Sequence, residues 1–80
     1  MKLTSDIDVE VWLASALKDP HLTTRKLEVI LGKGRRECYI KPKGYLGDET
    51  WHKINSLVHM KGGKWDAKNK LWTVPLERQP

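Results

Sequence analysis

Residues 62–75 have the sequence GGKWDAKNKLWTVP, and this stretch decides how the chain folds. It follows a helical pattern, opens on a glycine pair, carries two of the four tryptophans and ends on a proline. Glycine after a helix favours a left-handed helix end, and two short runs around a polar tip are typical of a hairpin. We therefore expect a closing β-hairpin with strands over 64–66 and 70–74, ended by Pro75, which cannot donate to a ladder.

A helix is expected directly before this hairpin, because Asp48 is a capping residue and an amphipathic pattern follows it to about Met60. Its apolar face consists of Trp51, Ile54, Leu57 and Val58, and its polar face of His52, Asn55, Ser56 and His59. Gly62 follows at the position where a left-handed residue is favoured. Upstream, residues 41–47 contain one proline and two glycines, which predict a loop.

The chain begins with another predicted helix. Ser5 is a capping residue, and Asp6 and Asp8 place carboxylates in the first turn, where the helix dipole favours negative charge. The helix ends at Asp19, before a proline. Its broad apolar face consists of Val9, Trp12, Leu13, Ala16 and Leu17, and a narrower apolar stripe consists of Ile7, Val11 and Ala14. A helix that is apolar on two sides in so short a chain predicts a homodimer whose interface contains that stripe.

Residues 24–31 fit either a helix or a strand. Over 27–31 every second residue is leucine or valine, and a turn with two glycines follows, so we favour a strand. Residues 36–41 are then its antiparallel partner in a first hairpin. This choice turns Ile30 away from the core.

Taken together, these elements predict an α+β fold, in which a four-stranded antiparallel sheet of two hairpins has two helices packed on one face. Eighty residues form a single domain over 1–80, in which residues 76–80 are expected to be a frayed tail. No apolar run approaches the roughly 18 residues of a membrane span. The single cysteine, Cys38, excludes a disulfide scaffold and fits a reducing compartment, so we expect a soluble cytoplasmic protein.

The net charge of +5 is unevenly distributed along the chain. Residues 1–20 hold two lysines against four carboxylates, so the excess of cations lies entirely in residues 21–80. A basic body of this kind predicts a polyanionic partner, most often nucleic acid. A charged surface that only keeps the protein in solution is the alternative reading of the same charges.

The histidines and the cysteine do not predict a metal site or a cofactor. Ligands on one helix need a spacing of three or four residues, whereas His52 and His59 are seven apart and His21 is remote in the sequence. Cys38 lies in a strand with no histidine base beside it, so a small buried thiol is the better interpretation. We therefore expect a protein that is not an enzyme and has no small-molecule substrate.

Residues 66–68, Asp-Ala-Lys, offer the acid and the lysine of a magnesium-dependent nuclease, but the further carboxylates of such a site are missing from the strand. A small metal-dependent nuclease would need Asp66 to gather with Glu37 or Asp48. A charged hairpin tip is the simpler interpretation.

The predicted binding surface lies on the open face of the sheet. Alternation along residues 35–41 turns Cys38 and Ile40 toward the helices and places Tyr39 between cations on the other face. Aromatic rings stack on unpaired bases while lysine and arginine follow the phosphates. In the closing hairpin we expect Trp72 in the core and Trp65 partly exposed. The predicted nucleic-acid-binding residues are Arg35, Arg36, Tyr39, Lys41, Lys43, Tyr45, Lys64, Trp65, Lys68 and Lys70.

The predicted function is therefore that of a non-catalytic protein that binds single-stranded nucleic acid, DNA in preference to RNA, with weak sequence selectivity. The alternative is a protein-interaction or regulatory module of a virus or plasmid, which would use the apolar stripe of the first helix.

Two family resemblances agree with nucleic-acid binding. Residues 63–76, Gly-Lys-Trp-Asp-Ala-Lys-Asn-Lys-Leu-Trp-Thr-Val-Pro-Leu, together with the helix from Asp48, resemble the closing unit of the HARP domain of annealing helicases. This resemblance covers the C-terminal half of the chain and implies DNA binding without a catalytic residue. The whole chain, with its leading apolar helix and basic aromatic face, is similar to the archaeal ThermoDBP-related proteins, which implies binding of single strands as dimers or higher assemblies.

Overall fold

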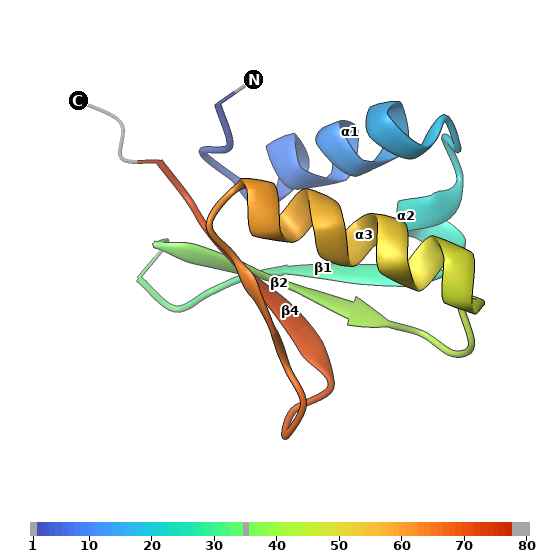
Figure 1. Ribbon diagram of the computed structural model, residues 1–80. Helices are drawn as coiled ribbons and strands as arrows, with labels where there is room; N and C mark the ends of the chain where they lie inside the picture. Colours follow the sequence, from blue (N-terminus) through green and yellow to red (C-terminus); the bar gives the residue numbers. More distant parts are fainter. Residues whose placement is uncertain (1, 35, 78–80) are drawn as a thin grey trace.

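The computed structural model describes residues 2–34 and 36–77, apart from the side chains of residues 23 and 24. Their elements are α1 (Asp6–Leu17), α2 (Leu22–Arg25), β1 (Leu27–Leu31), β2 (Glu37–Pro42), α3 (Asp48–Met60), β3 (Lys64–Asp66) and β4 (Leu71–Pro75). The strands form one antiparallel sheet in the order β1-β2-β4-β3, and α1 and α3 lie on the same face of it (Figure 1). This confirms the predicted α+β fold. No helix within the described ranges is long and apolar enough to cross a membrane.

Each long helix covers one of the two hairpins. α1 packs against β1 and α2, whereas α3 packs against β3 and β4. The hairpins join in the middle of the sheet, where β2 pairs with β4 and Ile40 lies opposite Trp72. Residues 24–31, which fit either a helix or a strand, contain both: α2 ends at Arg25, and β1 begins at Leu27.

Strand alternation places the core as the sequence predicts. On β2, Cys38 and Ile40 are fully buried toward the helices, while Tyr39 and Lys41 lie on the open face. Ile30 lies opposite Tyr39 and is 40% exposed, as its predicted position on the open face requires. The buried core consists of Leu3, Val9, Leu13, Leu22, Leu27, Cys38, Ile40, Leu46, Ile54, Val58, Trp72 and Val74.

The two long helices begin in different ways. Ser5 is the N-cap of α1 as predicted, and its side chain accepts a hydrogen bond from the backbone N–H of Asp8 at 3.3 Å. The carboxylate of Asp8 accepts in turn from the Thr4 hydroxyl at 2.6 Å, and this bond lowers the pKa of Asp8. The predicted cap of α3 is wrong. Gly47 is the N-cap, at φ 86°, and Asp48 is the first helical residue, because the chain enters α3 through a positive φ that glycine adopts easily.

The glycine pair ends α3 as predicted. Gly62 has a left-handed φ of 81°, and its N–H donates to the His59 carbonyl at 3.0 Å. The N–H of Gly63 donates to the Val58 carbonyl at 2.9 Å, which completes the Schellman pattern of helix termination. A Cβ on Gly63 would lie 2.6 Å from Val58 Cγ1 and would overlap the Thr73 carbonyl oxygen. The second glycine therefore allows β4 to approach the end of α3.

The two ends of the chain are tied together by the backbone. The N–H of Leu76 donates to the Arg36 carbonyl at 2.9 Å, and the N–H of Glu77 donates to the Leu3 carbonyl at 2.7 Å. The predicted frayed tail over 76–80 thus begins with two residues whose backbone N–H groups are hydrogen-bonded. Residues 78–80 lie outside the described part of the chain.

Candidate nucleic-acid interface

Three tryptophans from α3 and the closing hairpin form one cluster. The ring centroids of Trp65 and Trp72 are 4.7 Å apart, and the Trp51 ring lies 5.4 Å from each of them. Trp72 is fully buried, which confirms its predicted place in the core, whereas Trp51 and Trp65 are half-buried. The cluster thus extends from the core to the surface, because the half-buried rings of Trp51 and Trp65 pack against the buried ring of Trp72.

Asn55 corrects the predicted polar face of α3. Its side-chain oxygen accepts a hydrogen bond from Trp72 Nε1 at 3.1 Å, so the side chain is turned toward the sheet. A buried indole N–H needs an acceptor, and Asn55 supplies it. The periodicity of α3 could not reveal this, because the partner lies on a strand that follows the helix.

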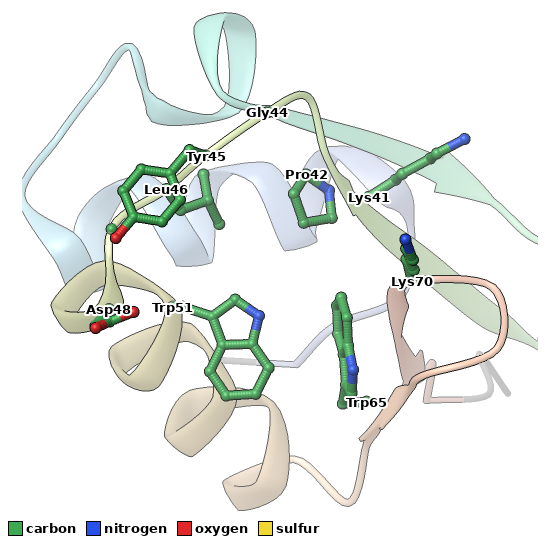
Figure 2. A pocket seen from close by; sticks show the side chains of 10 residues that line it. Lys41, Pro42, Gly44, Tyr45, Leu46, Asp48, Trp51, Trp65 and Lys70 are labelled. Carbon is green, nitrogen blue, oxygen red and sulfur yellow. The ribbon is translucent and has the colours of Figure 1, made fainter.

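Trp51 and Trp65 line a pocket of about 370 Å³ at the end of β2 (Figure 2). The loop before α3 and the start of β4 complete its walls. The lining residues are Lys41, Pro42, Gly44, Tyr45, Leu46, Gly47, Asp48, Trp51, Trp65 and Lys70. Figure 2 shows Tyr45 and Asp48 at one end of the pocket and Lys41 and Lys70 at the other. Pro42 and Leu46 lie across the pocket from the two tryptophans.

A second, smaller hollow of about 130 Å³ lies on the other side of the same loop. Its cations are Arg25 and Lys26, at the end of α2, and Lys43. The backbone N–H of Lys43 donates to the Lys26 carbonyl at 2.9 Å, which holds the loop beside α2. Tyr45 borders both hollows and is 87% exposed, so its ring stands between two groups of cations.

The structure does not bring all the predicted binding residues together. Trp65 lies opposite Trp72, which is paired with Ile40, so Trp65 belongs to the helix side of the sheet. Tyr39 lies on the open face, in the row that continues through Thr73 to Lys64. The two predicted stacking residues are therefore on opposite faces of the sheet.

The remaining predicted cations are spread over the molecule. Arg36 is exposed beside the start of β2, at the opposite end of that strand from the pocket, and Lys68 is exposed at the tip of the closing hairpin. Arg35 lies outside the described residues. Lys41, Lys43, Tyr45, Trp65 and Lys70 are the predicted residues that the pocket and its neighbouring hollow bring together.

Sequence reasoning missed four residues around these hollows. Trp51 has the periodicity of a core residue and is also half-exposed at the pocket, while Asp48 was assigned to the helix start and, in the nuclease alternative, to a metal site. Arg25 and Lys26 form a basic pair in the sequence, and this pair could have indicated a phosphate contact. Their position beside Lys43 depends on how α2 packs.

Tyr39 on the open face is held by its neighbour. Its hydroxyl donates to Glu37 Oε1 at 2.5 Å, and this hydrogen bond raises the pKa of Tyr39 above its usual value of 10.0. The side chain is half-buried between Ile30 and Thr73 in the adjacent strands. The ring is thus ordered along the sheet rather than standing free between cations.

Asp66 has a structural role at the hairpin tip. Its carboxylate accepts from the backbone N–H groups of Lys68 and Asn69 at 3.0 and 3.1 Å, and from Asn69 Nδ2 at 2.8 Å. The side-chain bond from Asn69 is the main reason that the pKa of Asp66 is lowered. Within residues 2–34 and 36–77, no group of three or more His, Cys, Asp or Glu side chains is placed to hold a metal ion.

Cys38 is fully buried under α1, as the sequence predicts. Burial raises the pKa of Cys38 to about 12, and the negative charge of Asp6 adds to the shift. The thiolate is the reactive form of cysteine, so this thiol is protected against chemical attack.

The predicted dimer stripe lies on the outer side of α1. Ile7 is 63% exposed and Val11 is 48% exposed, whereas Ala14 is half-buried. Two large apolar side chains one turn apart thus remain in contact with solvent.

Comparisons of this chain with protein-family models, with curated proteins and with solved structures found no match.

Proposed function

We propose that this protein binds single-stranded nucleic acid without catalysing a reaction. The observation that carries the proposal is the pocket at the end of β2, which is lined by the aromatic residues Tyr45, Trp51 and Trp65 and has the exposed lysines Lys41 and Lys70 at the end away from Tyr45. Proteins that bind single strands combine aromatic rings, which stack on bases, with cations that attract the phosphates. A volume of about 370 Å³ is at the lower end of small-ligand sites and suits a single nucleotide.

The cations on both sides of Tyr45 suggest the course of the strand. One phosphate lies at Lys41 and Lys70, the chain crosses the exposed Tyr45 ring, and the next phosphates lie near Arg25 and Lys26. Most of these contacts are to the backbone, which every sequence shares, so these contacts contribute little sequence selectivity. The resemblance of the C-terminal half to the HARP domain favours DNA over RNA.

Fluorescence anisotropy with labelled oligonucleotides tests this proposal. A single strand and a duplex of equal length are titrated at two salt concentrations with the wild type, Tyr45→Ala and the double variant Lys41→Gln/Lys70→Gln. We expect the single strand to bind more tightly, and Tyr45→Ala to weaken its binding by about 1–3 kcal/mol because one stacking ring is lost. The double variant lowers the salt dependence by about 1.4 log units per log salt, since each phosphate contact contributes roughly 0.7.

The matched control is Lys33→Gln. Lys33 is an exposed lysine in the turn between β1 and β2, at the other end of the sheet from the pocket, and its loss should leave the salt dependence unchanged. Equal affinity for the duplex, a flat response to salt, or a Tyr45→Ala variant that binds as the wild type does would each contradict the proposal.

We also propose that two copies associate through α1, with Ile7 and Val11 in the interface. The exposure of these two side chains supports this arrangement, because apolar surface gains free energy when it leaves water. A dimer would present two pockets to one strand and raise the effective affinity. The fully buried free thiol of Cys38 suits a reducing cytoplasmic location, which is part of the same proposal.

A further inference from the structure

The pocket is chemically different at its two ends. Lys41 and Lys70 lie at one end, where the Lys41 side chain extends away from the pocket, and the exposed carboxylate of Asp48 lies at the other end beside Tyr45 (Figure 2). Phosphate contacts account for the lysines but not for the carboxylate, because an anion near the strand opposes binding. The first turn of α3 favours a carboxylate at this position, and the fold places that carboxylate at the pocket.

The walls between these ends are mainly aromatic and apolar, and the rings of Trp51 and Trp65 are inclined at 74° to each other. Trp51 and Trp65 form one side, and Pro42 and Leu46 form the other (Figure 2). A base whose phosphate lies at the lysine end would pack against one of the tryptophan rings and turn its outer edge toward Asp48. The pocket thus places a carboxylate where it could meet the edge of a bound base.

Asp48 is available for such a contact. It is the first residue of α3, and its cap position is taken by Gly47, which has no side chain to interact with. Within the described residues neither a hydrogen bond nor an ion pair engages its carboxylate, whereas the neighbouring Glu49 is paired with Lys53 at 3.1 Å. The backbone N–H groups at the start of α3 stabilise a negative charge at this position.

We propose that the pocket selects guanine, and that the carboxylate of Asp48 is the residue that recognises it. A carboxylate only accepts hydrogen bonds, and its two oxygens match two adjacent donors. Among the four bases, guanine alone presents two neighbouring N–H groups on its Watson–Crick edge, at N1 and at the 2-amino group. Adenine and cytosine present one amino group beside an acceptor, and thymine presents one N–H between two acceptors. This inference rests on the proposed binding of single strands.

The test uses the full-length protein and a series of short oligothymidylates that carry one central guanine, hypoxanthine, adenine or cytosine. We expect the guanine oligomer to bind roughly tenfold to a hundredfold more tightly than unsubstituted oligothymidylate. Hypoxanthine lacks the 2-amino group and keeps N1–H, so its oligomer should have an intermediate affinity. Isothermal titration calorimetry measures all five affinities without a label.

Asp48→Asn should abolish the preference, because the amide replaces one acceptor oxygen with a donor. Its affinity for unsubstituted oligothymidylate should rise, since a negative charge that opposes the phosphates is removed. Glu49→Gln is the matched control, because it alters the adjacent carboxylate on the same helix turn and should retain the preference. Circular dichroism checks that both variants are folded.

The outcomes separate this inference from the proposed function. If the oligomers bind in a salt-dependent way with equal affinity for all central bases, or if Asp48→Asn keeps the guanine preference, guanine selection is wrong and single-strand binding stands. If none of the oligomers binds, the proposed function itself is wrong, and guanine selection is wrong with it.

Discussion

Gly62 and Gly63 are adjacent at the end of α3, and each is required for a different physical reason. Gly62 adopts a φ of 81°, which costs other residues free energy, while the nearest atom to a Cβ there would be Pro75 Cγ at 3.7 Å. Gly63 has no positive φ, but a Cβ would overlap the Thr73 carbonyl and lie 2.6 Å from Val58 Cγ1. Gly62 is required for its backbone conformation, whereas Gly63 is required because there is no room for a side chain.

This difference predicts different responses to substitution. Gly63→Ala should lower the free energy of unfolding by about 1–3 kcal/mol, because β4 must move away from α3. Gly62→Asn should cost less than 1 kcal/mol, roughly, because asparagine tolerates the left-handed conformation. Urea unfolding followed by tryptophan fluorescence measures both values. A Gly62→Asn variant that is less stable than Gly63→Ala would contradict this account of the glycine pair.

The sequence predicted least well which individual residues come together at the candidate site. Tyr39 and Trp65 are correctly predicted to be partly accessible, but the register of β3 places them on opposite faces of the sheet. Asn55 has a polar side chain and is nevertheless turned to Trp72. In both cases the deciding contact joins residues on different elements, and local periodicity has no information about it.

At the scale of the element, hydrogen bonds to Asp66 hold the tip of the closing hairpin together. Its carboxylate accepts three hydrogen bonds from the tip, and its pKa is held below the ordinary value of 3.8, chiefly by Asn69. A lowered pKa in the folded state means that the ionised form stabilises the fold above pH 3.8 or so. This contribution is lost as the pH falls through the folded pKa.

We therefore expect stability to fall below about pH 4, and Asp66→Asn to remove part of that dependence. Urea unfolding at a series of pH values between about 5 and 2.5 measures the effect. Asp19→Asn is the control, since its carboxylate accepts one bond from the backbone N–H of His21 at an exposed site.

The wild type and the Asp66→Asn variant should both leave nucleic acid uncleaved in the presence of magnesium. Magnesium-dependent cleavage by the wild type would favour a nuclease.

The α1 helix carries the proposed dimer contact on the side opposite its core residues. The double variant Ile7→Gln/Val11→Gln should shift the dimer to monomer at concentrations where the wild type is dimeric, because it removes apolar area from the interface. Sedimentation velocity at several protein concentrations measures this shift.

Ile30→Gln is the matched control for that experiment, because Ile30 is also an exposed isoleucine, 40% accessible, but lies on the open face of the sheet. It should leave the dimer intact. A wild type that sediments as a monomer throughout the concentration range would leave no role for the stripe in self-association.

For the whole molecule, the pairing of β2 with β4 joins two hairpins that each have their own helix. Ile40 and Cys38 from the first hairpin lie opposite Trp72 and Val74 from the second, so one core serves both halves. Neither half has a separate set of buried residues. A domain of this size with a shared core is expected to unfold in one cooperative step.

Coincident transitions would verify that cooperativity. Three of the four tryptophans lie in α3 and the closing hairpin, so fluorescence reports mainly on the second half, while far-ultraviolet circular dichroism reports on both. We expect the two urea curves to superimpose. A circular dichroism transition that precedes the fluorescence transition would indicate that the first hairpin and α1 unfold separately.

Local patterns in the sequence identified the two long helices, the four strands and the buried side of each. Periods of 2 and 3.6 residues are local properties, and they correctly placed Cys38, Ile40 and Trp72 in the core and Ile7 and Val11 outside it. Capping residues and the glycine pair, which are also local features, predicted most of the helix ends. These signals depend only on neighbours along the chain, so they can be seen before folding is considered.

The position of the candidate binding site depends on contacts between elements that are distant in the sequence. The pocket exists because the end of β2, the loop before α3 and the closing hairpin meet at one corner of the sheet. Trp51 and Trp65 become its walls because β3 pairs with β4 beside α3, and Arg25 becomes part of the surface because α2 packs beside the loop. Such contacts join segments that are distant in the sequence, and no local pattern records them.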